Sequence, residues 1–114
     1  MKTFTDERGI IEDLKVGKDW SVTYISFKKG AVRGNHYHKE TTQVDTILSG
    51  SFLCKTDRGS QEVFKNQIVS HLPNEHHAYL ALEDSEMVSM CFGKRIGENY
   101  EEDTFRLTEK EKLL

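Results

Sequence analysis

The sequence predicts an all-β domain, a sandwich or barrel built from antiparallel strands. Short segments rich in β-branched and aromatic residues recur along the chain, and their apolar and polar positions alternate. Turn-forming residues such as Gly, Asn, Asp and Pro separate these segments at close intervals. The intervals leave no room for the crossover helices that a parallel sheet requires, so an antiparallel arrangement is favoured.

The predicted strands cover most of the chain between residues 10 and 92. A turn at 5–9 (TDERG) precedes the first of them, and a tight turn at 57–60 (DRGS) separates two later ones. In chain order, the predicted strands are 10–14, 21–27, 44–48, 51–56, 61–64, 68–72, 77–82 and 87–92.

The pattern changes after Gly93. The segment 94–103 carries six charged residues in ten and does not alternate, which predicts a loop or a flap beside a ligand. Thr108 and Glu111 form a capping box, which predicts a short terminal helix over 108–114. The chain shows no internal repeat, so we expect a single domain spanning 1–114.

Charge and composition narrow the class of protein. The formal net charge is −3, and Lys and Arg are scattered among Asp and Glu, which argues against a nucleic-acid partner. No apolar run approaches the roughly 20 residues of a membrane span, and the first ten residues lack the apolar core of a signal peptide. Cys54 and Cys91 fit no metal spacing. We interpret them as reduced thiols of a cytoplasmic protein, with a disulfide as the alternative.

Two groups of histidines suggest a site assembled from two parts of the chain. His36 and His38 share one face if their segment is a strand, because side chains alternate. Gln43 joins them if the chain returns as the strand that starts at Val44. The second group lies at 71–77 (HLPNEHH).

Within the second group, His77 is the expected site residue, and His76 is the alternative because a slip of one residue reverses the faces. His71 is expected to be an ordinary polar neighbour on a strand face that need not converge with His77. Among the aromatic residues, the ones expected in the core or in a dimer interface are Trp20, Tyr24, Phe27, Phe52 and Phe92.

The spacing of the first group resembles the first signature motif of the cupins, which are small jelly-roll β-barrels also described as double-stranded β-helices. The residues that carry the resemblance are Gly30, His36, His38, Gln43 and Gly50. The second cupin motif is matched only at His77, with Pro73 one place away from the expected proline. The resemblance covers about residues 20–95, which would then form the barrel core.

The run RGNHYHKETTQV at 33–44 is similar to nucleotide-sugar 3,4-ketoisomerases among the cupins, and DERGII at 6–11 resembles the start of sugar-nucleotide cupins. RGNHYH also recurs in cupin domains of capsular-sugar reductase–epimerases. The resemblance implies an isomerase or epimerase that acts on a dTDP- or UDP-linked 4-keto-6-deoxyhexose in surface-polysaccharide biosynthesis. In such an enzyme a histidine moves the proton, a tyrosine donates one, and polar side chains hold the substrate. The implied catalytic residues are His36, His38 and Tyr79, and the implied substrate-binding residues are Arg33, Gln43 and Tyr24.

A metal site is the alternative. Three imidazoles and the neutral oxygen of Gln43 suit Zn, Fe, Ni or Mn, and they would leave the ion strongly Lewis-acidic for oxygenase or other metal-dependent chemistry. The implied ligands are His36, His38, Gln43 and His77. A cupin that binds a small molecule without turnover is the third possibility. In each case we expect a homodimer, because an open sheet edge tends to be covered.

Overall fold

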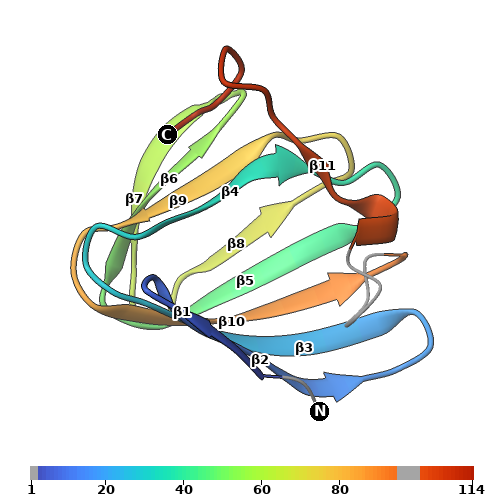
Figure 1. The fold of residues 1–114 in the computed structure, drawn as a ribbon, viewed down its shortest axis with the longest axis horizontal. Coiled ribbons are helices and arrows are strands. Elements are labelled where there is room, and N and C mark those ends of the chain that lie inside the picture. Colours follow the sequence, from blue (N-terminus) through green and yellow to red (C-terminus); the bar gives the residue numbers. More distant parts are fainter. Residues whose placement is uncertain (1–2, 95–100) are drawn as a thin grey trace.

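The computed structural model describes residues 3–94 and 101–114, which form two antiparallel sheets facing each other (Figure 1). Sheet A has the order β1 (Thr3–Asp6), β2 (Gly9–Val16), β3 (Trp20–Phe27), β10 (Ser85–Phe92), β5 (Thr42–Ser49) and β8 (Ile68–His71). Sheet B has the order β11 (Phe105–Arg106), β4 (Val32–Tyr37), β9 (His77–Ala81), β6 (Ser51–Thr56) and β7 (Gly59–Phe64). The all-β prediction is confirmed.

The two ends of the chain extend both sheets. The predicted turn at 5–9 is the tip of a hairpin in which β1 pairs with β2. Near the other end, β11 pairs with β4 along the edge of sheet B. Hydrogen-bonded strands therefore lie on either side of the predicted barrel core at 20–95.

The predicted helix at 108–114 is wrong. Half of the capping box forms, with the backbone N–H of Thr108 donating to the Glu111 carboxylate at 3.1 Å, but only one turn follows. The backbone N–H groups of Leu113 and Leu114 donate to the Asn35 side chain instead of to a helix. So short a helix is marginal by itself, because its first turn is costly to form. Of the predicted flap, residues 95–100 lie outside the described residues, and 101–103 form a single 3₁₀ turn.

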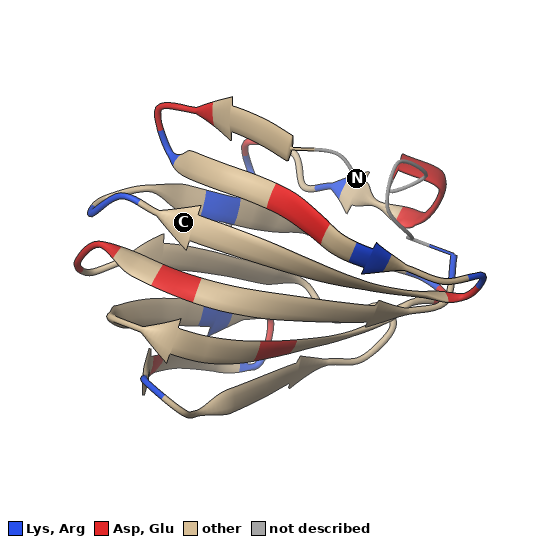
Figure 2. Cartoon of the chain, turned by 90° about the horizontal axis from the view of Figure 1, so that it is seen from below, with Lys and Arg blue, Asp and Glu red and all other residues tan. Residues whose placement is uncertain are grey.

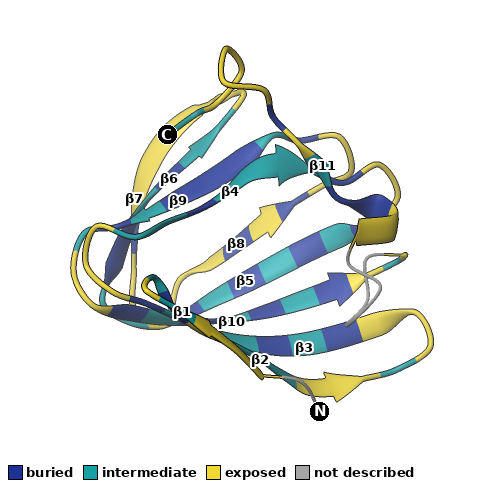
Figure 3. Cartoon of the chain, in the orientation of Figure 1, coloured by how far each residue is buried: buried dark blue, intermediate teal, exposed yellow. Residues whose placement is uncertain are grey.

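Buried positions recur along the strands of both sheets (Figure 3). The side chains buried between the sheets are apolar at one end of the interior and polar at the other. Strand β5 shows the gradient, because its inward positions are Gln43, Asp45 and then Ile47. The apolar end is a cluster of buried side chains that includes the predicted core residues Phe27 and Phe52, whose rings meet edge to face at 4.7 Å. The gradient places the candidate site at the polar end.

The outer surface is mixed in charge. In the view of Figure 2, Lys and Arg positions are interspersed with Asp and Glu positions along the described strands and loops. Trp20 and Phe92 are paired neighbours on the outside of sheet A and are 37% and 44% exposed, so neither belongs to the core. Cys54 and Cys91 are both buried and carry reduced thiols. Within the described part of the chain, no helix has the length and apolarity to span a membrane.

Candidate metal and substrate site

His36 and His38 lie at the end of β4 and point into the polar end of the interior. Their ring centroids are 4.9 Å apart. Tyr37, between them, points to the opposite face and stacks on His76 at 4.8 Å. The alternation expected for an extended segment therefore holds through the His-x-His pair.

A β-bulge in β4 brings Arg33 to the same side as these histidines. The register with β9 shifts between Gly34 and His36, and Asn35 adopts a positive φ of 56° at the shift. Arg33 and His36 are three positions apart, so a regular strand would send them to opposite faces. The extra residue restores them to one face, with Arg33 opposite Tyr79 and His36 opposite His77.

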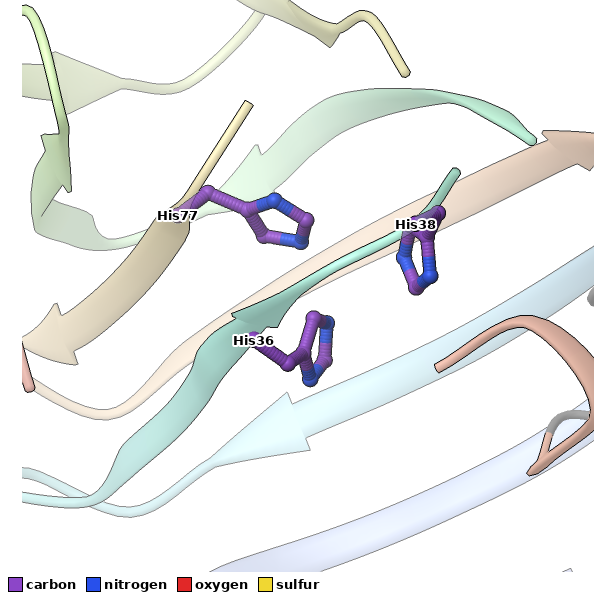
Figure 4. A group of neighbouring side chains, drawn as sticks. All are labelled: His36, His38 and His77. Carbon is purple, nitrogen blue, oxygen red and sulfur yellow. The ribbon is translucent and has the colours of Figure 1, made fainter. Parts of the chain in front are cut away.

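His77 completes a cluster of three imidazoles with His36 and His38 (Figure 4), and their ligating nitrogens lie within 4.8 Å of one another. His77 is 1% exposed, and its Nδ1–H donates to the backbone carbonyl of Glu75 at 3.2 Å. Its Nε2 is buried and has no hydrogen-bond partner among the described residues. Of the adjacent pair His76 and His77, it is therefore His77 that faces the interior.

Gln43 faces His38 across the same space. Its amide nitrogen donates to both carboxylate oxygens of Asp45, at 3.1 and 2.9 Å, and this fixes the direction of the side chain because a carboxylate only accepts. The amide oxygen then lies 3.0 Å from His38 Nε2. On its other side, His38 Nδ1–H donates to the backbone carbonyl of Asp103 at 2.7 Å.

This arrangement leaves two lone-pair atoms facing each other. A neutral imidazole carries one N–H, and in His38 that proton is held on Nδ1. Close contact between Nε2 and the Gln43 oxygen is favourable only with a second proton on the ring or with a cation shared by both atoms. Together with the partnerless Nε2 of His77, which has no acceptor or donor within the described chain, the donor set of three nitrogens and one oxygen fits a divalent ion such as Zn, Fe, Ni or Mn.

The prediction that His71 is an ordinary polar neighbour is wrong. His71 is 1% exposed and stacks on His77 with a centroid distance of 4.2 Å. Its Nδ1 contacts the Glu75 carboxylate at 2.9 Å, and its Nε2 lies 2.7 Å from the Tyr79 hydroxyl and 3.4 Å from Asp45. Glu75 in the connection between β8 and β9 supplies the second carboxylate, which sequence spacing does not reveal.

Burial, and after it the charge of His71, keep His77 neutral. Burial disfavours the charged form of His71, but hydrogen bonds and charge from Asp45 and Glu75 outweigh it and raise the His71 pKa. Burial, with His71 as the next cause, lowers the pKa of His77 to about 3. The imidazole of His77 is therefore neutral at neutral pH, as a metal ligand must be.

The other three predicted site residues, Arg33, Tyr79 and Tyr24, lie in different parts of the structure. Arg33 is buried at 8% exposure, lies over the Phe27 ring at 5.3 Å, and its Nε has no acceptor within the described structure. Tyr79 is buried behind His71 and donates to Asp45 at 2.6 Å, an arrangement that with burial raises its pKa well above the usual value. Tyr24 lies on the outer face of β3, where its hydroxyl donates to Glu86, so the structure does not bring it to the cluster.

No family model and no curated protein matches the sequence. Solved structures do match. KdgF from Halomonas sp. is 19% identical, with a TM-score of 0.73 over 83% of this chain and 88% of that one. The capsular polysaccharide assembling protein CapF from Staphylococcus aureus is 21% identical, with a TM-score of 0.75 over 93% of this chain and 32% of CapF. A sugar phosphate isomerase of the cupin superfamily from Silicibacter pomeroyi is 14% identical, with a TM-score of 0.61 over 66% of this chain and 51% of that one.

The chain has the cupin fold. The two facing antiparallel sheets are the structural basis of this assignment, since the matches extend over most of their strands. The chain spans about a third of CapF and about half of the Silicibacter isomerase. In this chain, the histidine cluster lies at the polar end of the barrel interior, where the connection between β4 and β5 meets the start of β9.

Proposed function

We propose that this cupin is a sugar isomerase or epimerase whose three histidines and Gln43 hold a divalent metal ion. The observation that carries the proposal is the cluster of His36, His38 and His77, with the Nε2 of His77 buried and without a partner in the described chain. An unpaired buried nitrogen costs about 1–3 kcal/mol of folding free energy. A bound ion would remove that cost.

The chemistry follows from the ligand set. When bound, the ion would polarise a carbonyl or hydroxyl oxygen of the substrate and make the adjacent C–H more acidic. Asp45 holds the Gln43 amide so that its oxygen faces the cluster, and the Glu75 carbonyl holds His77 so that Nε2 does. Both are outer contacts that fix the direction of a ligand.

The burial of Arg33 favours a substrate that carries an anionic group. Its guanidinium is 8% exposed, and the carboxylate of Asp6 lies 4.0 Å away. Burial lowers the Arg33 pKa, with the charge of Arg8 acting in the same direction. A buried cation so weakly compensated would gain from a phosphate or carboxylate of the substrate, which guanidinium binds in a bidentate manner. The similarity to a sugar phosphate isomerase and to CapF supports a sugar as the carrier of that group.

The more specific proposal is a dTDP- or UDP-linked 4-keto-6-deoxyhexose, as the resemblance of residues 33–44 implies. For this substrate a second, metal-free mechanism has its own support. A second proton on His38 satisfies the contact between Nε2 and Gln43 as well as a cation does. His36, which is only half buried, would then take the proton beside the sugar carbonyl and return it at the neighbouring carbon.

Metal content separates the two mechanisms. We expect untagged protein purified without chelator to contain nearly one equivalent of Zn, Fe, Ni or Mn by elemental analysis, and His36→Ala to lose it. His76→Ala is the matched control, because His76 stacks on Tyr37 on the opposite face and should leave the metal in place. Wild-type protein that folds normally but contains no metal would overturn the metal mechanism.

Deuterium incorporation tests the reaction class. Isomerisation and epimerisation both begin by removing a proton beside a carbonyl, so turnover in D₂O should place deuterium on the substrate carbon. A thermal-shift screen of dTDP- and UDP-sugars would select the substrate, and mass spectrometry would detect the label. Binding without any incorporation would instead indicate a cupin that only binds its ligand.

A further inference from the structure

Asp103 lies far from the histidines in sequence but is tied to the segment that carries His38. The Asp103 side chain is buried, with 2% of the residue exposed. Its carboxylate accepts from the backbone N–H of Lys39 and of Glu40, both at 2.9 Å, and from the Thr41 hydroxyl at 2.7 Å. These three donors belong to the connection between β4 and β5.

The same residue also holds the His38 ring. The backbone carbonyl of Asp103 accepts from His38 Nδ1–H at 2.7 Å. That bond keeps the proton on Nδ1 and leaves Nε2 to face Gln43 and the cluster. Asp103 therefore acts on His38 twice, through the ring and through the backbone that follows it.

The C-terminal segment also bonds to Asn35, the residue that precedes His36. Asn35, the bulge residue next to His36, accepts at its side-chain oxygen from the N–H groups of Leu113 and Leu114. Its backbone carbonyl accepts from Leu107 N–H at 2.8 Å. In Figure 1 the C-terminal segment runs beside β4 and over the connection to β5.

We propose that Asp103 is a positioning residue that presents Nε2 of His38 to the metal, and that residues 101–114 act as a strap that keeps the His-x-His pair in ligating geometry. The inference rests on the proposed metal site. Strand β4 and the cupin fold do not by themselves fix the orientation of His38, because the bonds that hold it come from a residue more than 60 positions away.

A purely structural clamp would behave differently. If Asp103 served only to close the connection between β4 and β5, its loss would lower stability and leave a refolded site intact. A residue that orients a ligand should instead weaken metal binding in protein that is still folded. Loss of an outer partner of a ligand typically weakens metal affinity by about 10–100-fold.

The experiment compares Asp103→Ala with Asp103→Asn and with Glu109→Ala. Asparagine keeps the volume and one acceptor oxygen, which protects against simple loss of folding. Glu109 is the control, since it lies in the same segment, its side chain is 88% exposed, and it pairs with Lys112, away from the histidines. For each protein, Co²⁺ affinity is measured by competition with a chromophoric chelator, and the Co²⁺ absorption spectrum is recorded.

A second readout needs no metal. In ¹⁵N NMR spectra of the metal-free protein, His38 should show a protected Nδ1 proton. We expect its solvent exchange to accelerate at least about tenfold in Asp103→Ala, less in Asp103→Asn and not at all in Glu109→Ala. The Co²⁺ dissociation constant should rise about 10–100-fold in Asp103→Ala, with an altered spectrum.

The experiment distinguishes failure of the positioning role from failure of the metal site. Unchanged Co²⁺ affinity and unchanged Nδ1 protection in folded Asp103→Ala and Asp103→Asn would overturn the positioning role, whatever happens to stability. Wild-type protein that binds no Co²⁺ would refute the metal site, while loss of Nδ1 protection in Asp103→Asn would still establish that Asp103 orients His38. If Asp103→Ala does not fold, Asp103→Asn decides.

Discussion

The two ends of the barrel interior are built from the same strands but from opposite kinds of residue. Strand β5 contributes Ile47 to one end and Gln43 to the other, and β9 contributes Ala81 and His77 in the same way. The strand pattern that fixes inward and outward faces is thus shared. The residues that form the core and those that form the candidate site therefore occupy different lengths of the same strands.

The two ends contribute to stability with opposite sign. At the apolar end, Phe27, Phe52 and their neighbours lose contact with water and gain close packing. At the polar end, the buried Nε2 of His77 has no partner within the described residues. Burying it is unfavourable in the absence of a ligand. The apolar end must therefore supply the stability that the polar end consumes.

The largest expected effect is at the apolar end. Phe52 has no exposed surface and contacts both the Phe27 and Tyr79 rings, so Phe52→Ala should lower the free energy of unfolding by about 3–5 kcal/mol. Urea denaturation followed by circular dichroism measures the change. Phe64→Ala, at a position 49% exposed, is the control and should cost far less. A loss below about 1 kcal/mol at Phe52 would mean that stability does not come from this end.

The all-β fold is predictable because it rests on local signals. Alternation and turn residues are properties of short segments, and they place most strands within a few residues of their observed bounds. The terminal helix is mispredicted for a non-local reason. The Glu111 carboxylate caps the Thr108 N–H, but the Asn35 side chain accepts from the N–H groups of Leu113 and Leu114. No pattern within residues 108–114 encodes that competition.

The candidate site is only partly predictable. His36, His38, Gln43 and His77 are predicted from the resemblance to the cupin motifs, and the structure brings their side chains to one end of the interior. The bulge at Asn35 is not foreseen, although a Gly-Asn pair before the histidines is a signal for positive φ.

The residues that hydrogen-bond the histidines from distant parts of the chain cannot be predicted, for a different reason. Glu75 lies in a loop whose path is set by tertiary packing, and Asp103 contacts residues more than 60 positions away. Sequence spacing carries no information about such contacts. The error at His71 has the same origin, because its stacking on His77 depends on how the connection between β8 and β9 folds back.

Metal binding should offset the unfavourable burial of polar atoms at the polar end and so raise the free energy of unfolding. A ligand that binds only the folded protein stabilises it by about 2.7 kcal/mol at a hundred times its dissociation constant. We expect Zn²⁺ or Ni²⁺ at that level to raise the free energy of unfolding of wild-type protein by this amount and to leave His77→Ala unaffected. Equal stabilisation of both proteins would place the ion elsewhere. Differential scanning calorimetry at fixed protein concentration gives the measurement.

A further test uses two glycines, Gly30 on the approach to β4 at the apolar end and Gly34 within β4 toward the polar end. Gly30 bonds to Ala81 at the apolar end and has open space where a Cβ would lie, whereas a Cβ on Gly34 would lie 2.9 Å from Ala78 Cα. Both have positive φ, so alanine at either position costs about 1–2 kcal/mol of backbone strain. Gly34→Ala should cost about 1–3 kcal/mol more, because β4 must move away from β9.

That movement should also displace the histidines. Gly34 lies two residues before His36, on the other side of the bulge, and pairs with Ala78 of β9, the strand that carries His77. We therefore expect Gly34→Ala to weaken Co²⁺ binding by at least about tenfold and Gly30→Ala to leave it unchanged. Chemical denaturation and chelator competition on the two variants measure both quantities. Equal losses of stability and equal Co²⁺ affinities would show that the spacing of β4 and β9 does not control the histidine cluster, and that the polar end tolerates the same backbone changes as the apolar end.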